Sequence, residues 1–168
     1  MNALPHRLPA RAQQLVQELA LQPHPEGGFF REVYRSPLTV QPADGRSARS
    51  ALTTIDFLLA RGQFSAWHRV RSDEVWHLLE GEGLRLWLIA PPLSSAGAID
   101  LRRTGAQPRL RHVVPAHWWQ AAEPLGEYAL AGATVGPGFD FADFAFGRDH
   151  AELRQALRRL APGAQRLL

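Results

Sequence analysis

The sequence predicts an all-β protein with short N- and C-terminal helices, and three observations lead to this fold class. The 168-residue chain is 45% hydrophobic and 21% charged, as expected for a globular protein of one domain. About ten short runs rich in aromatic and β-branched residues recur at intervals of roughly 8–14 residues. Gly, Pro, Asp or Ser separates these runs, and no helical pattern lies between them. We therefore expect an antiparallel sandwich or barrel, because a parallel sheet would need crossover helices.

Helical periodicity is confined to the two ends of the chain. Residues 9–21 begin with a proline, carry apolar residues at helical spacing and end before two further prolines. Near the other end, Asp149 and Glu152 have the spacing of a capping box, so Asp149 is the predicted N-cap. The leucines that follow form one apolar stripe, which predicts a C-terminal helix.

The strands between these helices are predicted from apolar and branched runs bounded by turn residues. Two stretches, residues 39–49 and 93–98, have the composition of loops. The predicted strands span residues 28–36, 50–59, 64–69, 74–80, 84–90, 99–103, 110–114, 118–122, 128–135 and 141–146.

Two missing residue types exclude several kinds of chemistry. All 19 basic residues are Arg, so the chain has no lysine amine for a Schiff base, a pyridoxal phosphate linkage or a P-loop. The chain also has no Cys, which excludes thiolate nucleophiles, disulfides, Cys-type zinc sites and iron–sulfur clusters. Any catalysis must therefore come from His, Asp, Glu, Tyr, Ser, Thr and Arg.

Charge and hydropathy predict a cytoplasmic protein that binds neither nucleic acid nor membranes. The net charge is only +3, and the arginines are scattered apart from one group at residues 102–111 and another in the last helix. No apolar run reaches the roughly 18 residues that span a bilayer. Glu18 interrupts the apolar stretch that a signal peptide would need at the N-terminus.

The segment from Phe64 to Gly81 holds the main candidates for chemistry. Strand alternation and a turn between the two strands are expected to point His68 and Glu74 into one barrel interior from neighbouring strands. Such a pair can coordinate a divalent metal, or it can act as a base with its orienting partner. The alternative is structural: a hydrogen-bonded core histidine, with Glu74 paired to a nearby surface arginine.

The same residues resemble the first motif of the cupin superfamily. His68, Glu74 and Gly81 follow its spacing, whereas Val70 stands where the motif has its second histidine. Because Val70 offers no donor atom, this half of the usual cupin metal site is incomplete.

Residues 109–124 resemble the second cupin motif in outline. Pro115 is in place, and Gln120 stands at the position of the metal-binding histidine. The resemblance thus leaves His68, Glu74 and Gln120 as the candidate metal ligands. Since an amide oxygen binds transition metals far more weakly than imidazole does, we expect no cofactor, with a divalent metal as the alternative.

Four separated segments are similar to the cupin-5 branch, a group of small cupins of largely unassigned function. The resemblance implies a double-stranded β-helix jelly roll with a ligand pocket inside the barrel, in a homodimer. Together with the helical patterns at the two ends, it predicts a helical extension over residues 1–20, a cupin domain over 21–147 and a C-terminal helix over 148–168. The four segments are residues 24–34, 67–77, 114–118 and 136–144.

Cupin-5 proteins have been likened to sugar-nucleotide epimerases, which implies metal-independent proton transfer on a sugar-like or nucleotide-linked carbonyl compound. His68 is then the candidate base, Glu74 its partner, and Tyr128 the candidate acid, with Tyr34 as the other available tyrosine. The further candidates for ligand contact are Glu26, Tyr34, Trp76, Trp118 and Gln120.

Two alternative functions remain open, namely a cupin that binds a metabolite without catalysis and a metal-dependent oxygenase or isomerase.

Strand alternation places His77 on the face opposite Glu74. Glu26 lies in a glycine-rich bend expected at the barrel mouth, and Asp140 lies in a turn whose aromatic residues close the barrel. The strand over residues 28–36 is expected to pair with its copy across the two-fold axis of a dimer.

Overall fold

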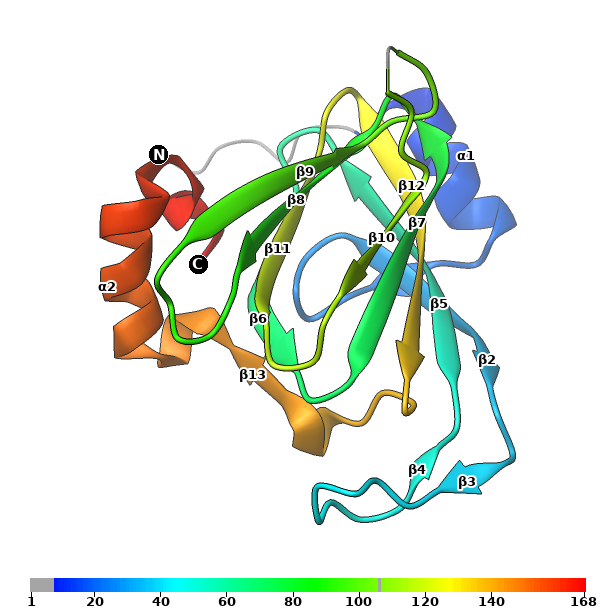
Figure 1. The fold of residues 1–168 in the computed structure, drawn as a ribbon. Coiled ribbons are helices and arrows are strands. Elements are labelled where there is room, and N and C mark those ends of the chain that lie inside the picture. The colour runs from blue at the N-terminus through cyan, green and yellow to red at the C-terminus, as the bar shows by residue number, and fades with distance from the viewer. Residues whose placement is uncertain (1–7, 106) are drawn as a thin grey trace.

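The computed structural model describes residues 8–105 and 107–168, which form two facing antiparallel sheets (Figure 1). The predicted all-β jelly roll with terminal helices is thereby confirmed. The first seven residues of the predicted N-terminal extension lie outside the described residues. The larger sheet has the order β1 (Gln22–Pro23), β2 (Phe29–Arg35), β5 (Thr53–Ala60), β12 (Tyr128–Gly136), β7 (Asp73–Gly81) and β10 (Arg111–Val114). The smaller has the order β13 (Phe144–Phe146), β6 (Ser65–Val70), β11 (Trp119–Pro124), β8 (Leu84–Ile89) and β9 (Ala96–Leu101).

Helices and a short arm complete the described chain. A two-stranded arm projects from one end of the barrel (Figure 1). Its strands are β3 (Thr39–Val40) and β4 (Arg49–Ser50). The helices are α1 (Ala10–Glu18), η1 (Phe141–Asp143), η2 (Gly147–Asp149), α2 (Ala151–Leu160) and η3 (Pro162–Leu167), where η marks a 3₁₀ helix. Within the described ranges, no helix is long and apolar enough to cross a membrane.

Several predicted boundaries of strands and loops were wrong. The predicted strand over 50–59 is divided between β4 and β5. The predicted loop over 39–49 contains β3 and the start of β4, and the predicted loop over 93–98 contains the start of β9. The segment 141–143 is the 3₁₀ helix η1 because the Asp140 carboxylate accepts a hydrogen bond from the backbone N–H of Ala142 (2.8 Å). An N-terminal cap of this kind favours a helical turn over an extended strand.

The predicted N-cap of the C-terminal helix was also wrong. Asp149 is the last residue of η2, and His150 is the N-cap of α2. The 3₁₀ turn closes with a hydrogen bond from the His150 N–H to the Gly147 carbonyl (3.0 Å), which places Asp149 outside the first turn of α2.

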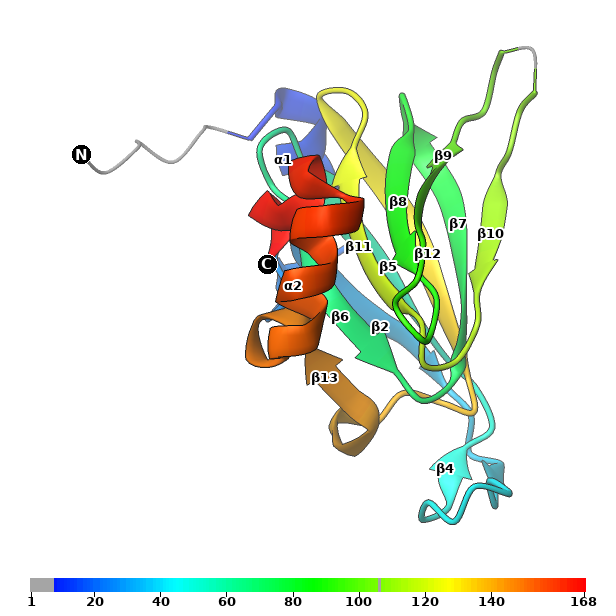
Figure 2. The same cartoon turned by 60° about the vertical axis from the view of Figure 1, so that its left-hand side comes forward.

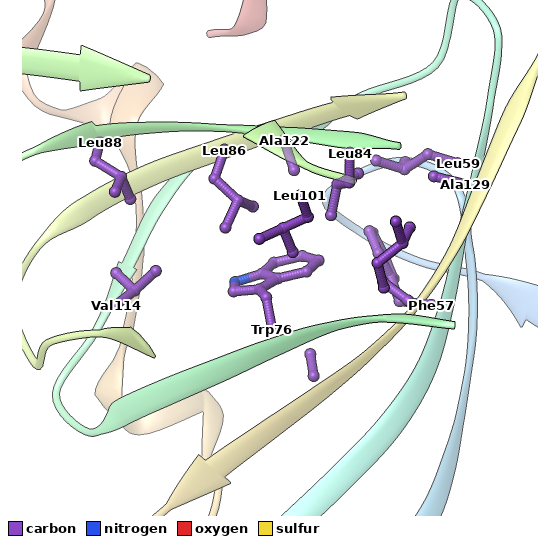
Figure 3. Packing of buried hydrophobic residues seen from close by; sticks show 13 residues of the cluster. Phe57, Leu59, Trp76, Leu84, Leu86, Leu88, Leu101, Val114, Ala122 and Ala129 are labelled. Carbon is purple, nitrogen blue, oxygen red and sulfur yellow. The ribbon is translucent and has the colours of Figure 1, made fainter. Parts of the chain in front are cut away.

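The main core lies between the two sheets (Figure 3). Inward-facing residues alternate along each strand, so that Trp76 of β7 lies among leucines from the opposite sheet. Figure 3 shows its indole ring beside Leu86 and Leu101, with Phe57 of β5 nearby. Small alanines on β12 leave room for these large side chains.

The terminal helices cover outer faces of the barrel (Figure 2). Leu153 and Leu157 of α2 pack with Trp67 and Trp119 on the smaller sheet, where the Trp67 indole N–H donates to the Ala164 carbonyl (2.8 Å). At the other side, Leu15 of α1 packs on one end of the larger sheet. Both helices therefore contribute apolar cores of their own to the fold.

The connection from β6 to β7 corrects one part of the predicted geometry. These strands follow each other along the chain, but they do not pair, because β6 belongs to the smaller sheet and β7 to the larger. The short turn between them is thus a corner where the chain changes sheets. His68 and Glu74 consequently reach the barrel interior from two different sheets instead of from neighbouring strands.

Candidate functional site

A cavity of about 500 Å³ opens at the end of the barrel where β7 begins and β12 ends, the lower end in Figure 1. This volume lies within the range of small-molecule sites in proteins. Apolar side chains from both sheets form most of its wall. Four of the predicted site residues line it, namely Glu26, His68, Glu74 and Trp76. A fifth, Gln120, adjoins it through hydrogen bonds with Glu74 and Trp76.

His68 presents a basic nitrogen to this cavity. Its ring is only 2% exposed and stacks on Phe144 of β13 at a centroid distance of 5.5 Å. Nδ1 lies 2.8 Å from the Ala66 carbonyl, which can only accept, so Nδ1 carries the proton. Burial lowers the pKa of His68, although the neighbouring Glu74 opposes this effect. The ring is therefore neutral at pH 7, with its lone pair on Nε2.

The hydrogen bonds of the buried polar atoms show that Nε2 of His68 faces the cavity. Among the described residues, every fully buried side-chain nitrogen or oxygen has a hydrogen-bond partner. No protein group in this part of the chain bonds to His68 Nε2, nor to the second carboxyl oxygen of Glu26 or Glu74. These three atoms are accordingly accessible from the cavity.

Glu74 is held by a chain of hydrogen bonds that crosses the barrel. The Gln120 amide N–H donates to Glu74 Oε2 (2.5 Å), and the Trp76 indole N–H donates to Gln120 Oε1 (2.9 Å). Because the indole can only donate, it fixes the Gln120 amide with its NH₂ group toward Glu74. Burial raises the pKa of Glu74 to about 7, with the neighbouring Glu26 adding to the rise and His68 and Gln120 opposing it.

Glu26 enters the site from the glycine-rich bend. The backbone N–H of Ala66 donates to the Glu26 carbonyl (2.9 Å), which ties the bend to β6. Gly27 permits this approach, since it has a φ of +114° and a Cβ there would lie 2.2 Å from the Phe64 carbonyl oxygen. The Glu26 carboxyl accepts from the Ser65 hydroxyl (2.7 Å), and burial raises its pKa. Its 3.4 Å approach to His68 Nδ1 is thus a contact with a neutral ring.

His24 is a cavity residue that the sequence analysis did not assign to the site. Its Nδ1 accepts the backbone N–H of Glu26 (3.1 Å), so Nε2 carries the ring proton, and burial lowers its pKa. The ring packs edge-on against Phe30 and Phe57. His24 and His68 therefore hold opposite tautomers. The available signal was the position of His24 two residues before Glu26, in a bend already assigned to the barrel mouth.

The cupin metal site does not fit the residues of this chain. Val70 lines the cavity without a donor atom, and the oxygen of Gln120 is already bound by Trp76. In residues 8–105 and 107–168, no three His, Cys, Asp or Glu side chains are grouped closely enough to hold a metal ion. The Gln120 side chain serves instead as a hydrogen-bond donor that orients Glu74.

The structure does not bring three predicted site residues to the cavity. Tyr128 lies on the outer face of β12, packs on the core beneath α1 and donates to Glu80 Oε1 (2.7 Å). Tyr34 follows an irregularity in β2 and is 49% exposed. Trp118 packs against the core between the sheets, just before β11 begins. His77, as alternation predicted, falls on the face of β7 opposite Glu74, in unbroken register with β12.

The mouth of the cavity is charged and aromatic. Arg35 of β2 donates to Glu32 through Nε (3.0 Å) and Nη2 (2.7 Å), and its Nη1 donates to the Phe139 carbonyl (3.2 Å). Phe139, Asp140 and Phe141 line the cavity beside Arg35. The turn before η1 therefore contributes to the cavity wall.

The raised pKa of Glu74 predicts an unusual pH dependence of stability. Between pH 4.5 and about 7, the folded protein keeps a proton on Glu74 that the unfolded chain has lost. The contribution of Glu74 to the free energy of unfolding is therefore greatest at acid pH and falls by up to about 3 kcal/mol as pH rises through 7. The stability of Glu74→Gln relative to wild type should accordingly increase from pH 5 to 8 in chemical denaturation.

Glu80→Gln is the matched control for this measurement. Hydrogen bonds from Arg11 and Tyr128 lower the pKa of Glu80 to about 2, so this group does not titrate between pH 5 and 8 in either state. The difference between this variant and wild type should stay constant over that range. A constant difference for Glu74→Gln as well would show that Glu74 is ionised throughout.

Comparison with known proteins agrees with the observed fold. The model of the Cupin_5 family, described as "Cupin superfamily (DUF985)", matches residues 13–147. An uncharacterized protein of Saccharomyces cerevisiae is 27% identical over 164 residues, covering 87% of this chain and 80% of the relative. A crystal structure from Shewanella oneidensis has 29% identity and a TM-score of 0.76 over 93% of both chains. A hypothetical protein from Leishmania major has 28% identity and a TM-score of 0.74 over 93% of this chain and 95% of its own.

The family match covers the bend with Glu26, both strands of the His68–Glu74 pair and the turn at the barrel mouth. The resemblance to the cupin-5 branch, predicted from residue patterns, is therefore confirmed. This chain belongs to the Cupin_5 (DUF985) family of the cupin superfamily.

Proposed function

We propose that this protein binds a small polar metabolite in the barrel and catalyses metal-independent proton transfer next to a carbonyl group, as an epimerase or isomerase. One observation carries the proposal: a neutral imidazole with a free Nε2 and a carboxyl group with a pKa of about 7 face one cavity from two different sheets. The imidazole offers a free basic nitrogen and the carboxyl group gains or loses its proton near neutral pH, and general acid–base catalysis requires one group of each kind.

The roles follow from the tautomers and hydrogen bonds. His68 Nε2 removes the proton from the carbon beside the carbonyl, and Glu74 returns a proton to that carbon from the side of the larger sheet. The Nε2–H of His24 donates to the oxygen that gains negative charge in the enolate. Gln120 and Trp76 are positioning residues, because they orient Glu74. Glu74 takes over the role of acid that the sequence analysis gave to Tyr128.

Exchange of substrate hydrogen with solvent tests this proposal. The purified protein is incubated in D₂O with keto-sugars, both free and nucleotide-linked, and proton NMR follows the C–H next to the carbonyl. We expect catalysed loss of that one signal, because the abstracted proton mixes with solvent. Saturable binding without exchange across the set would instead favour a non-catalytic metabolite-binding cupin.

The edge of β2 supports a homodimer as part of the proposal. Within the described residues, β1 pairs only with Phe29 and Phe30, so the rest of this edge of β2 is open. Val33 and Tyr34 on the same strand are 42% and 49% exposed. We expect two copies to pair there across a two-fold axis. Light scattering at micromolar concentration should give twice the mass of the chain, and Val33→Arg should give a monomer.

A further inference from the structure

The cavity contains more negative than positive groups. Glu26 and Glu74 lie deep in it, and Glu32 and Asp140 lie at its mouth. Among the described residues that line it, Arg35 is the one arginine, and both histidines are neutral at pH 7 because burial lowers their pKa values. An anionic ligand would thus meet carboxylates on entry and no cationic group at the bottom, where burial raises the pKa values of Glu26 and Glu74.

Arg35 is already engaged by protein groups. Its Nε and Nη2 donate as a fork to the Glu32 carboxylate, and Nη1 donates to the Phe139 carbonyl. Arginine binds phosphate best through two parallel N–H groups, and this fork is the one that Glu32 occupies. Arg46 and Arg49 lie beyond the rim, where both donate to Asp143. Among the described residues, the cavity and its rim consequently offer no open guanidinium for a diphosphate.

The remaining surface suits an uncharged polyol. The accessible polar atoms inside the cavity include His68 Nε2, the Nε2–H of His24 and one carboxyl oxygen each of Glu26 and Glu74, all able to bind hydroxyl groups. The cavity wall also carries the rings of Phe57 and Trp76, against which the C–H face of a sugar packs well. The cavity thus offers both hydroxyl-binding atoms and aromatic rings to a sugar.

From this arrangement we infer that the substrate is an uncharged keto-sugar, and that the carboxylates at the mouth reject phosphorylated and nucleotide-linked forms. The inference deepens the proposed function and rests on it for the site. The sequence analysis expected either a sugar-like or a nucleotide-linked carbonyl compound, and the inference keeps only the uncharged sugars.

Calorimetric titration of matched pairs tests the inference. The probes are fructose and tagatose, each compared with its 6-phosphate, together with a free 4-keto-6-deoxyhexose and its nucleoside diphosphate ester. We expect at least one free sugar to bind, and to bind at least about tenfold more tightly than its charged partner. The double variant Glu32→Gln/Asp140→Asn should reduce the ratio of the two affinities about tenfold, because it removes the Asp140 charge from the mouth and frees the Arg35 fork from the Glu32 carboxylate.

Glu18→Gln/Glu127→Gln is the control for the double variant, since it removes two carboxylates on the outer surface. The affinity ratio should not change in it. The inference is overturned if a charged form binds as tightly as its free sugar, or if no free sugar binds at millimolar concentration. Exchange is read separately: a free sugar that binds without exchange contradicts only the proposed catalysis, whereas exchange confined to the nucleotide-linked sugar contradicts only this inference.

Discussion

His68→Asn is expected to lower the rate of solvent deuterium exchange by about 10²- to 10⁴-fold, the usual contribution of a positioned general base. The substitution is chosen because the asparagine N–H can replace Nδ1–H as the donor to the Ala66 carbonyl. What it removes is Nε2, the one basic atom that His68 presents to the cavity. NMR exchange rates at saturating substrate measure this loss directly.

His77→Asn is the matched control for this variant. It makes the same chemical change three residues after Glu74, on the opposite face of β7. We expect wild-type exchange from it, and a thermal unfolding midpoint for His68→Asn close to that of the control. If His68→Asn were folded and exchanged hydrogen at the wild-type rate, His68 would not be the base.

Much of this fold was open to sequence reasoning because its strands are short, alternating and separated by turn residues. Periodicity alone located β6, β7, β8 and β12 to within a residue or so of their ends. It also placed Glu74 and Trp76 on one face and His77 on the other. Alternation is a local property, so a single sequence is enough to read it.

The site was less predictable because it depends on pairing between distant strands. Alternation separates Tyr128 from Ala129, but it does not say which of the two faces the core. The packing of α1 against the outer face of β12 decides that, and it directs Tyr128 away from the cavity. In the same way, Gln120 was matched to a metal-ligand position by motif spacing. Only the indole N–H of Trp76, on the other sheet, shows that its amide acts as a donor.

The ion-pair network near the cavity mouth likewise depends on residues that are far apart in the sequence. Asp143 of η1 accepts from Arg46 (2.8 Å) and from two nitrogens of Arg49 (2.9 and 3.0 Å). Arg46 also donates to Ser72 at the corner between β6 and β7 (3.1 Å). Burial would raise the pKa of Asp143, but these hydrogen bonds hold it below its ordinary value. The network therefore joins the β3–β4 arm, η1 and the corner that carries the site.

Asp143→Ala is expected to reduce the free energy of unfolding by about 3–5 kcal/mol, the cost of removing one partner from a buried ion pair. The side chains of Asp143 and Arg46 are each 5% exposed, so the variant leaves a guanidinium charge poorly compensated away from water. Chemical denaturation at pH 7 measures this loss. Asp44→Ala is the control, because Asp44 also pairs with Arg46 but is 37% exposed, and it should cost about 1 kcal/mol or less.

The double variant Arg46→Met/Asp143→Leu distinguishes the cost of an unpaired buried charge from the cost of a lost contact. With both partners replaced by apolar groups, no unpaired charge remains, and we expect it to be more stable than Asp143→Ala alone. Equal losses for Asp143→Ala and Asp44→Ala would contradict a buried network. Because β13 follows Asp143 directly and its Phe144 stacks on His68, the same Asp143→Ala variant should also weaken ligand binding at the site.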